Sequence, residues 1–312
     1  IKLNDSSFDT FVKKLNPNIV LFDRFMTEEQ FGWRVAEQCP DALRILDTED
    51  LHFLRKGRQQ ALKDQALFDI SYLQNDFAKR EIASILRSDL SLIISQVEQD
   101  ILITQFGISP SLLYYLPFML EPVSIEDQKQ APNFKQRQHF VTIGNFLHEP
   151  NADAVNYLKT DIWPLIRKEL PKAEMHVYGA YASQKHLQLN DPKNGFLIKG
   201  FAEDVSEVVK QAKVLLAPLR FGAGLKGKII DAMKTGTPCV TTTIGAEGMY
   251  GTLKDTNAFI EDDAKNFAKQ AVELYTNKIY WRGKQKNGFR ILNTFYDKNI
   301  YLKDTIETIK HI

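Results

Sequence analysis

The residues best suited to bind an anion lie in one glycine-rich stretch that follows an apolar run. The stretch reads Gly222-Ala-Gly-Leu-Lys-Gly-Lys228 and opens a segment with helical spacing. Glycine lets a backbone approach a ligand closely, and the first N–H groups of a helix have no partner within the helix. Lys226 and Lys228 add positive charge at the positive end of the helix dipole, which is unfavourable unless an anion binds there. We therefore predict a phosphate-binding loop that includes Gly222, Gly224, Leu225, Lys226 and Lys228.

A carboxylate follows this loop at a spacing that suits a ligand with hydroxyl groups. Asp231 lies three residues after Lys228, so the two share one face of the expected helix. A carboxylate can accept hydrogen bonds from a pair of hydroxyl groups. Arg220 supplies a further cation just before the loop, and arginine binds phosphate well. The alternative interpretation is that both lysines are solvated and bind no ligand.

Further candidates follow short apolar runs that we interpret as parallel strands. These runs alternate with helical segments, as in α/β proteins, and open parallel sheets bind ligands beyond the carboxyl ends of their strands. Phe201 has the alternative role of a hydrophobic loop anchor. Glu247, in the stretch Ile244–Gly248 that we expect to be a flexible loop, is alternatively only solvated. The predicted ligand pocket comprises Gly144, Asn145, Tyr178, Gly179, Phe201, Ala202 and Glu247.

A second set of acids follows an apolar run in the first half of the chain. The loop reads Asp47-Thr-Glu-Asp-Leu-His52. Glu49 or Asp50 could accept a proton from a hydroxyl group or stabilise a developing positive charge, so we predict these two as catalytic residues. The alternative is an acid that caps the next helix. We expect Arg55 and Arg58 to be solvated.

The composition argues against several classes of protein. The chain has 40 Lys+Arg and 39 Asp+Glu residues, so it lacks the basic excess of a general nucleic-acid binder. Its two cysteines lie far apart and its six histidines form no spaced ligand set, so we expect neither a disulfide framework nor a protein-bound metal. We recognise no signal peptide or membrane-spanning run and expect a cytoplasmic protein.

The length of 312 residues suits two domains better than one. We expect an N-terminal domain over residues 1–120, a polar linker over 121–138, a C-terminal domain over 139–285 and a final helix over 286–312. Within these domains we expect helical stretches over 54–86 and 152–170.

The second half resembles the donor-binding domain of glycosyltransferase family 4, within the retaining GT-B class. The resemblance covers about residues 140–251. It implies two Rossmann-like domains whose parallel sheets face a cleft, with the final helix returning to the N-terminal domain. The first half resembles the acceptor domain more weakly, and we expect its opening segment to lie upstream of Ile1, which makes that domain incomplete. The motifs that carry the resemblance are Ile143–Val155, Ile162–Pro164, Gly200-Phe201 with Asp204, Ala217–Arg220, Gly222–Met233 and Ile244–Gly248.

This resemblance implies the transfer of a sugar from a nucleoside diphosphate sugar to an acceptor hydroxyl, with retention of anomeric configuration. The glycine-lysine loop and Arg220 would then bind the diphosphate, Asp231 the ribose, and the pocket the nucleobase and sugar. No cofactor is expected besides the donor substrate. The implied partners are this donor and a glycan, lipid-linked or small-molecule acceptor, with peripheral membrane contact compatible and nucleic acid excluded.

Two departures from the family pattern keep alternatives open. Ala223 stands where the better-known pattern has its first glutamate, and Glu49 stands where family members often have a histidine. The alternatives are a catalytically silent protein that binds sugar nucleotides, and an epimerase or phosphorylase built on the same fold.

Overall fold

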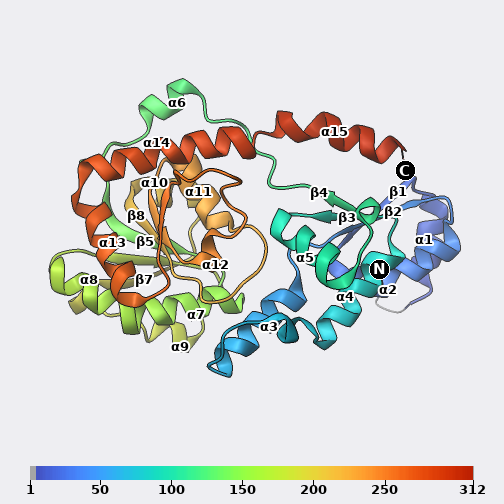
Figure 1. Ribbon diagram of the computed structural model, residues 1–312, viewed down its shortest axis with the longest axis horizontal. Helices are drawn as coiled ribbons and strands as arrows, with labels where there is room; N and C mark the ends of the chain where they lie inside the picture. The colour runs from blue at the N-terminus through green and yellow to red at the C-terminus, as the bar shows by residue number, and fades with distance from the viewer. Residues whose placement is uncertain (1–4, 312) are drawn as a thin grey trace. The chain divides into compact units, whose positions relative to one another are not determined.

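The computed structural model describes residues 5–311, and the chain divides into two compact units. Unit 1 comprises the residues up to Met119, the short segment Ala223–Leu225, and the residues from Asn299 onward. Unit 2 comprises Leu120–Gly222 and Lys226–Lys298. Figure 1 labels the helices and strands of both units, which we describe separately.

Unit 1 is built on a parallel sheet in the order β1-β2-β3-β4. Residues Ile19 to Asp23 of β1 pair in register with Leu43 to Asp47 of β2, so the two strands end side by side. Because the strands are parallel, the loops that follow them meet at one edge of the sheet. The strands are β1 (Ile19–Asp23), β2 (Leu43–Asp47), β3 (Leu90–Ile93) and β4 (Leu113–Tyr115).

Apolar faces of the surrounding helices complete the core of unit 1. Phe8 and Val12 of the first helix, Val35 of the second and Leu102 of the fifth pack in one buried cluster with strand residues such as Leu46. The helices are α1 (Ser7–Leu15), α2 (Arg24–Gln38), α3 (His52–Lys63), α4 (Asp76–Arg87), α5 (Gln96–Phe106) and α15 (Lys298–His311), with short 3-10 turns over Ile70–Leu73 and Pro110–Leu112.

The predicted helical stretch over 54–86 is wrong in its centre. Helix α3 ends at Lys63, and α4 begins only at Asp76. The side chain of Asp69 accepts a hydrogen bond from the N–H of Ser71, and that of Asn75 accepts one from Ala78. These short polar side chains satisfy backbone donors locally, which favours turns and helix starts over a continuous helix.

Unit 2 contains a parallel sheet of six strands in the order β10-β9-β8-β5-β6-β7. Strand order reverses beside β5, where β8 lies on one side and β6 on the other. Ligands of doubly wound sheets bind beyond the carboxyl ends of strands at such a reversal. The strands are β5 (Gln138–Ile143), β6 (Met175–Tyr178), β7 (Phe196–Gly200), β8 (Ala212–Ala217), β9 (Cys239–Thr241) and β10 (Ala258–Ile260).

Two groups of helices pack on the sheet of unit 2. Helices α7, α8 and α13 share a buried cluster with the strands, whereas α10 and α11 contact each other and α14 lies along α11 (Figure 1). The helices are α6 (Ile125–Gln130), α7 (Glu149–Tyr157), α8 (Trp163–Glu169), α9 (Gln184–Leu187), α10 (Val205–Gln211), α11 (Gly227–Thr235), α12 (Thr243–Ala246), α13 (Ala264–Thr276) and α14 (Lys278–Phe295), with a 3-10 turn over Pro192–Asn194.

The predicted helix over 152–170 contains one irregular turn. A π-helical turn over Leu158–Ile162 separates α7 from α8. Pro164 in the first turn of α8 has no N–H to donate and its ring crowds the carbonyl four residues earlier. The wider π turn accommodates this proline and lets the helical course continue.

The stretch over 121–138 is not a free linker, since it packs as part of unit 2. It contains α6, and the N–H of Val123 donates to Oδ1 of Asn293 over 2.8 Å. Arg137 is almost fully buried and donates to the carbonyls of Pro132, Ala212 and Thr235. These bonds hold the stretch against the sheet.

The predicted final helix over 286–312 is two helices. Helix α14 begins at Lys278, so Tyr280–Gly283, which we placed before the final helix, lies inside it. The indole of Trp281 donates to the carbonyl of Lys213 over 2.7 Å and anchors α14 on unit 2. From Asn299 the chain belongs to unit 1, where Tyr114 donates to Asp304 over 2.7 Å.

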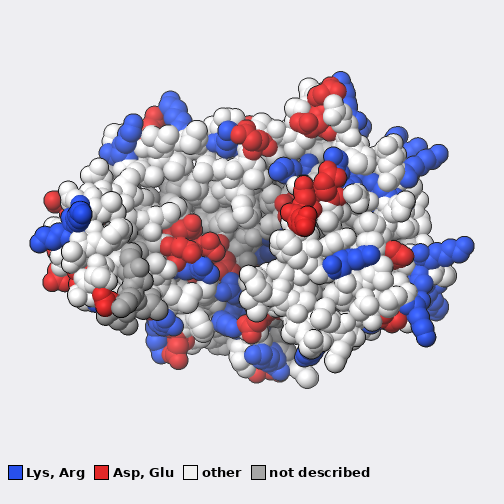
Figure 2. Space-filling view, turned by 180° about the vertical axis from the view of Figure 1, so that it is seen from behind, with Lys and Arg blue, Asp and Glu red and all other residues white. Residues whose placement is uncertain are grey.

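Charges of both signs are interspersed on the face shown in Figure 2, in keeping with the near equality of basic and acidic residues. Among residues 5–311, no helix combines the length and the apolar character that crossing a membrane requires.

A stacked histidine pair lies between β5 and β6 of unit 2. The rings of His139 and His176 lie 3.8 Å apart and nearly parallel, and Nε2 of His176 lies 2.8 Å from Oε2 of Glu174. Burial is the main cause that lowers the pKa of His139 from 6.5 to about 4, and the charge of His176 adds to it. Glu174 raises this pKa, whereas Lys199 lowers it. The folded protein therefore disfavours protonation of His139.

We expect His139 to make folding depend on pH. The unfolded chain binds a proton at this side chain near pH 6.5, whereas the folded chain does so only near pH 4, so stability falls as the pH falls between these values. The loss should not exceed about 3 kcal/mol. Urea unfolding of the wild type and of His139→Gln at pH 7 and pH 4.5 measures it. A free-energy difference between the two proteins that is equal at both pH values would contradict this expectation.

Candidate functional site

The glycine-lysine loop of unit 2 lies between β8 and α11, as expected. Helix α11 begins at Gly227, with Lys226 in an extended conformation at its N-cap. Only 8% of Lys226 is exposed, and a Cβ on Gly222 would lie 3.6 Å from its Cε. The aliphatic part of Lys226 is therefore packed beneath the loop. This burial excludes the solvated alternative for Lys226.

Lys228 lies in the first turn of α11 and is also largely buried. Its Nζ donates to Oδ1 of Asn151 over 2.8 Å. Burial lowers the pKa of Lys228 from 10.5 to about 8, and the nearby charge of Lys226 lowers it further. A regular helix would separate these two side chains, but the extended backbone at the N-cap brings them together. Two cations thus share the start of one helix, where an anion would stabilise both.

Asp231 occupies the next turn of α11 and is partly buried. Burial raises the pKa of its carboxyl group, with Lys234 acting in the opposite direction. Its backbone carbonyl accepts a hydrogen bond from the hydroxyl of Thr235 over 2.9 Å. The structure thus places a cation and a carboxylate one turn apart in the order that the sequence indicates.

The tip of the loop does not lie with the lysines. Ala223–Leu225 belongs to unit 1, and the N–H of Gly224 donates to Oε1 of Glu98 over 2.7 Å. This N–H therefore already has an acceptor within unit 1, and Leu225 beside it is buried. Ala223 packs in the apolar core of unit 1. A glutamate at that position would bury a carboxylate, which explains the departure from the family pattern.

Arg220 is already paired within unit 2. Its guanidinium donates to both carboxylate oxygens of Asp153 and lies over the ring of Tyr157 at 4.8 Å. The hydrogen bond to Asp153 is the main cause that raises the pKa of Arg220. Its charge is thus balanced by a carboxylate of the same unit.

Glycines at the ends of β5 and β6 form a tight backbone surface. The N–H of Gly144 donates to the carbonyl of Tyr178 over 3.0 Å, and that of Gly179 to the carbonyl of Gly200 over 2.7 Å. A Cβ on Gly179 would lie 2.3 Å from the carbonyl oxygen of Gly144. Asn145 is exposed and uses its side-chain oxygen to accept the N–H of Leu147. These residues adjoin one another at the carboxyl edge of the sheet.

The remaining pocket candidates differ in their surroundings. Phe201 is 71% exposed, which excludes the alternative role of a buried loop anchor, and Ala202 beside it is partly buried. The stretch Ile244–Gly248 is not the flexible loop that we expected. It is mostly the helical turn α12, capped by the side chain of Thr242, and Glu247 is the residue that ends it.

Unit 1 gathers its candidate acids at the carboxyl ends of β1 and β2. Asp23 and Asp47 are register partners at these ends, and the N–H of Glu49 donates to Oδ1 of Asp47. Glu49 and Arg24 both have a positive φ, 57° and 65°. Such backbone conformations are costly for these residue types and concentrate at functional sites. Burial and neighbouring acids raise the pKa of Glu49, while Arg24 opposes them.

Asp50 is held by two basic side chains. It forms an ion pair with Arg55, and Nε2 of His52 lies 3.4 Å from its Oδ1. The expectation that Arg55 and Arg58 are solvated is wrong, because Arg55 makes this pair and Arg58 is buried. These two contacts fix the position of the Asp50 carboxyl group.

Two buried glutamates cap helix α3 in place of the loop acids. Oxygens of Glu81 accept the N–H groups of His52 and Phe53 over 2.9 and 2.7 Å, and Glu98 accepts that of Leu51 over 3.2 Å. The alternative in which Glu49 or Asp50 caps this helix is therefore wrong. Burial raises the pKa of Glu81 to about 8, although its two hydrogen bonds oppose the shift. Sequence spacing gave no sign of these caps, which come from α4 and α5.

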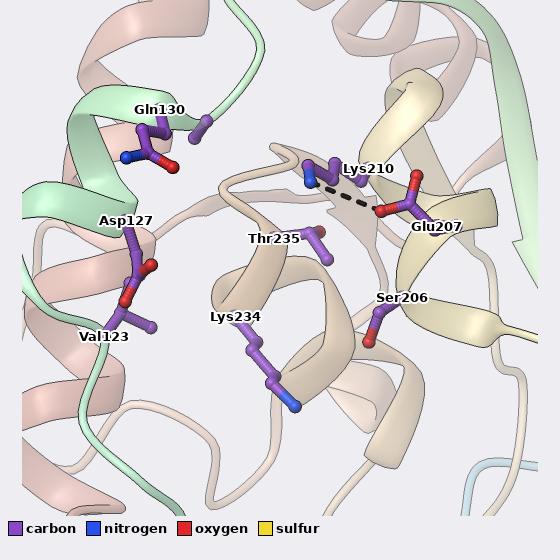
Figure 3. Close-up of a pocket in the computed structure, with 9 residues that line it drawn as sticks. Val123, Asp127, Gln130, Ser206, Glu207, Lys210, Lys234 and Thr235 are labelled. Carbon is purple, nitrogen blue, oxygen red and sulfur yellow. Dashed lines mark hydrogen bonds and ion pairs between the residues drawn. The ribbon is translucent and has the colours of Figure 1, made fainter.

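A separate hollow of about 210 Å³ lies at the other end of α11 (Figure 3). Lys210 and Glu207 pair across 3.3 Å on its wall. None of the predicted site residues contributes to it, so it is distinct from the lysine pair. Its lining comprises Val123, Asp127, Gln130, Ala131, Ser206, Glu207, Lys210, Lys234 and Thr235.

We expect Glu81→Ala to destabilise unit 1 strongly. The substitution leaves the N–H groups of His52 and Phe53 without acceptors in a buried place, which costs about 2–4 kcal/mol. Glu81→Gln keeps one acceptor oxygen and should lose about half as much. Chemical unfolding measures both, with the exposed Glu126→Ala as control. Equal stability of Glu81→Ala and the wild type would refute the capping role.

Comparison with known proteins finds a family match for the region around the lysine pair. Residues 137–277 match the family model of glycosyl transferases group 1. This region is therefore similar to the glycosyl transferases of group 1. The match extends beyond the residues 140–251 over which the sequence resemblance was recognised. An "Uncharacterized 44.6 kDa protein in cps region" of Klebsiella pneumoniae is 24% identical over 162 residues, which is 50% of this chain and 42% of that protein.

Similar solved structures show that the chain follows the GT-B fold. A mutant of S. aureus TarM, in complex with fondaparinux, α-GlcNAc-glycerol and UDP, matches 96% of this chain with a TM-score of 0.75 at 13% identity. The pneumococcal O-GlcNAc transferase GtfA, with UDP and GlcNAc, matches 97% with a TM-score of 0.68 at 17% identity. Anabaena HepE, with UDP and glucose, matches 98% with a TM-score of 0.68 at 14% identity. The predicted GT-B fold is confirmed.

The chain spans only part of several similar proteins. It covers 57% of the TarM chain and 59% of the GtfA chain, but 81% of HepE.

Proposed function

We propose that this protein transfers a sugar from a nucleoside diphosphate sugar to an acceptor hydroxyl, with retention of anomeric configuration as in glycosyltransferase family 4. The observation that carries the proposal is the pair of lysines at the start of α11, buried Lys226 and partly buried Lys228, inside the region that matches the glycosyl transferases group 1 model. Burial of two neighbouring cations is costly, and a diphosphate would stabilise both. Several similar structures contain UDP, so UDP is the first nucleotide to test.

Within this proposal, Lys226 and Lys228 bind the diphosphate and Asp231 accepts the ribose hydroxyls. Gly144 with Asn145 after β5, and Tyr178 with Gly179 at the end of β6, are proposed to line the pocket for the nucleobase and sugar. The exposed ring of Phe201 offers a further stacking partner. No cofactor is proposed besides the donor substrate.

The acids of unit 1 are proposed to serve the reaction itself. Glycosyl transfer passes through an oxocarbenium-like state, which an ionised carboxylate stabilises. Asp50, held by Arg55 and His52, suits that role. Glu49, with its raised pKa, suits the acceptance of a proton from the acceptor hydroxyl. The acceptor is proposed to be a glycan, a lipid-linked sugar or a small hydroxyl compound.

We expect a nucleoside diphosphate to stabilise the folded protein, because a ligand that binds only the folded state raises the free energy of unfolding. A thermal-shift screen of UDP, GDP, ADP and TDP, each with and without a sugar, identifies the donor. Lys228→Ala should weaken binding of that nucleotide about 10- to 100-fold, since it removes a charged hydrogen-bond donor. Calorimetry measures this loss.

Lys269→Ala, which removes an exposed lysine on α13, is the matched control for charge. No stabilisation by any of the four nucleotides would contradict the proposed function. Binding with equal affinity by Lys228→Ala would contradict the assignment of the site.

We expect Asp50→Asn and Glu49→Gln to lower kcat for sugar transfer by about 100-fold or more while donor affinity changes little. Initial rates with a radiolabelled donor, together with calorimetry of the same variants, separate the two effects. Asp76→Asn, an exposed acid of α4, is the control. Unchanged kcat in both site variants would remove these acids from the mechanism, and binding without turnover by the wild type would favour a silent binding protein.

A further inference from the structure

Asn151 is the direct partner of Lys228, although neither charge nor spacing singled it out as a site residue. It lies in the first turn of α7, and its Oδ1 accepts the Nζ of Lys228 over 2.8 Å. Its Nδ2 donates to the backbone carbonyl of Asn145 over 3.1 Å. Both ends of the amide are therefore used, and the two bonds define which end faces the lysine.

The backbone next to Asn151 is shaped to fit this amide. A Cβ on Gly144 would lie 2.6 Å from both Cγ and Nδ2 of Asn151, which no real side chain allows. The N–H of Gly144 is bound to the carbonyl of Tyr178 over 3.0 Å, so the sheet holds the glycine in place. The amide consequently has little freedom to turn away from Lys228.

A neutral acceptor has a different effect on Lys228 from that of an acid. The ammonium group has three donors, and Asn151 takes one of them, leaving donors for an anion. A carboxylate at this position would form an ion pair and cancel the charge, as Asp153 does for Arg220. Holding a long flexible side chain in one conformation also removes part of the entropy cost of binding.

We propose that Asn151 is a positioning residue of the donor site, which holds the ammonium group of Lys228 at the start of α11 without neutralising it. This inference rests on the proposed function, since it assigns the lysine to a diphosphate. The low pKa of Lys228, caused by burial and by Lys226, agrees with a site that has no acid beside the lysine.

A double-mutant cycle with UDP tests the inference, with GDP, ADP or TDP in its place if the screen selects one of them. By calorimetry, Asn151→Ala should weaken nucleotide binding about five- to tenfold, as expected for a lost hydrogen bond to a charged group. In a Lys228→Ala background the same change should add less than about twofold, because Asn151 acts through the lysine.

Two further variants separate positioning from a general effect on folding. Asn151→Asp keeps the shape of the side chain but neutralises Lys228, so it should bind the nucleotide at least as weakly as Asn151→Ala. Asn156→Ala, on the same helix, removes a side chain that donates to the carbonyl of Ala152, and this variant should bind like the wild type.

The outcomes distinguish this inference from the proposed function. Wild-type affinity in both Asn151→Ala and Asn151→Asp overturns the inference, and so does an equal loss with and without Lys228. A Lys228→Ala protein that binds as well as the wild type overturns the site assignment and the inference together. A wild type that binds none of the four nucleotides overturns the proposed function.

Discussion

The burial of two lysines beside the positive end of one short helix is the constraint on which the donor region depends. Each cation alone opposes the helix dipole, and together they repel each other. Three features surround these lysines. Lys226 is an extended N-cap, Lys228 has a neutral amide acceptor, and a glycine leaves room for that amide. The amide of Asn151 holds Lys228 without adding a negative charge beside it. The contrast with Arg220, which is neutralised by Asp153, shows that the same unit also contains cations with a purely structural partner.

In unit 1, by contrast, the side chains gathered at the candidate site are acids. Four carboxylates follow β1 and β2, and the helix start next to them would ordinarily recruit one of these acids as a cap. Glu81 and Glu98 take that role from other helices. Asp50 is then held by Arg55 and His52, and Glu49 adopts a left-handed backbone instead of a capping geometry. The distant caps thus separate the stability of α3 from the chemistry proposed for its loop.

The amino-acid sequence predicted the GT-B fold, the order of strands and helices around the lysine loop, and the placement of Lys226, Lys228 and Asp231. These features depend on local patterns: apolar runs of strand length, glycine before a helix, and a spacing of three residues on one helix face. The predictions from sequence were wrong mainly where contacts between distant residues determine the structure. They gave no sign of the bond between Gly224 and Glu98 and made 121–138 a linker, and in both cases the partner is far away in the chain. The expectation that Arg55 is solvated was wrong for a local reason, because its partner Asp50 lies five residues earlier.

What the sequence by itself determined is therefore the alternation of strand and helix and the positive character of one helix start, since both follow from residues within a few positions of one another. Only the tertiary structure decided which charges remain available. Asn151 lies 77 residues before Lys228, and Glu81 lies 29 residues after His52. Hydrogen bonds between such distant residues depend on how the strands of each sheet are ordered, so no local pattern could have indicated them.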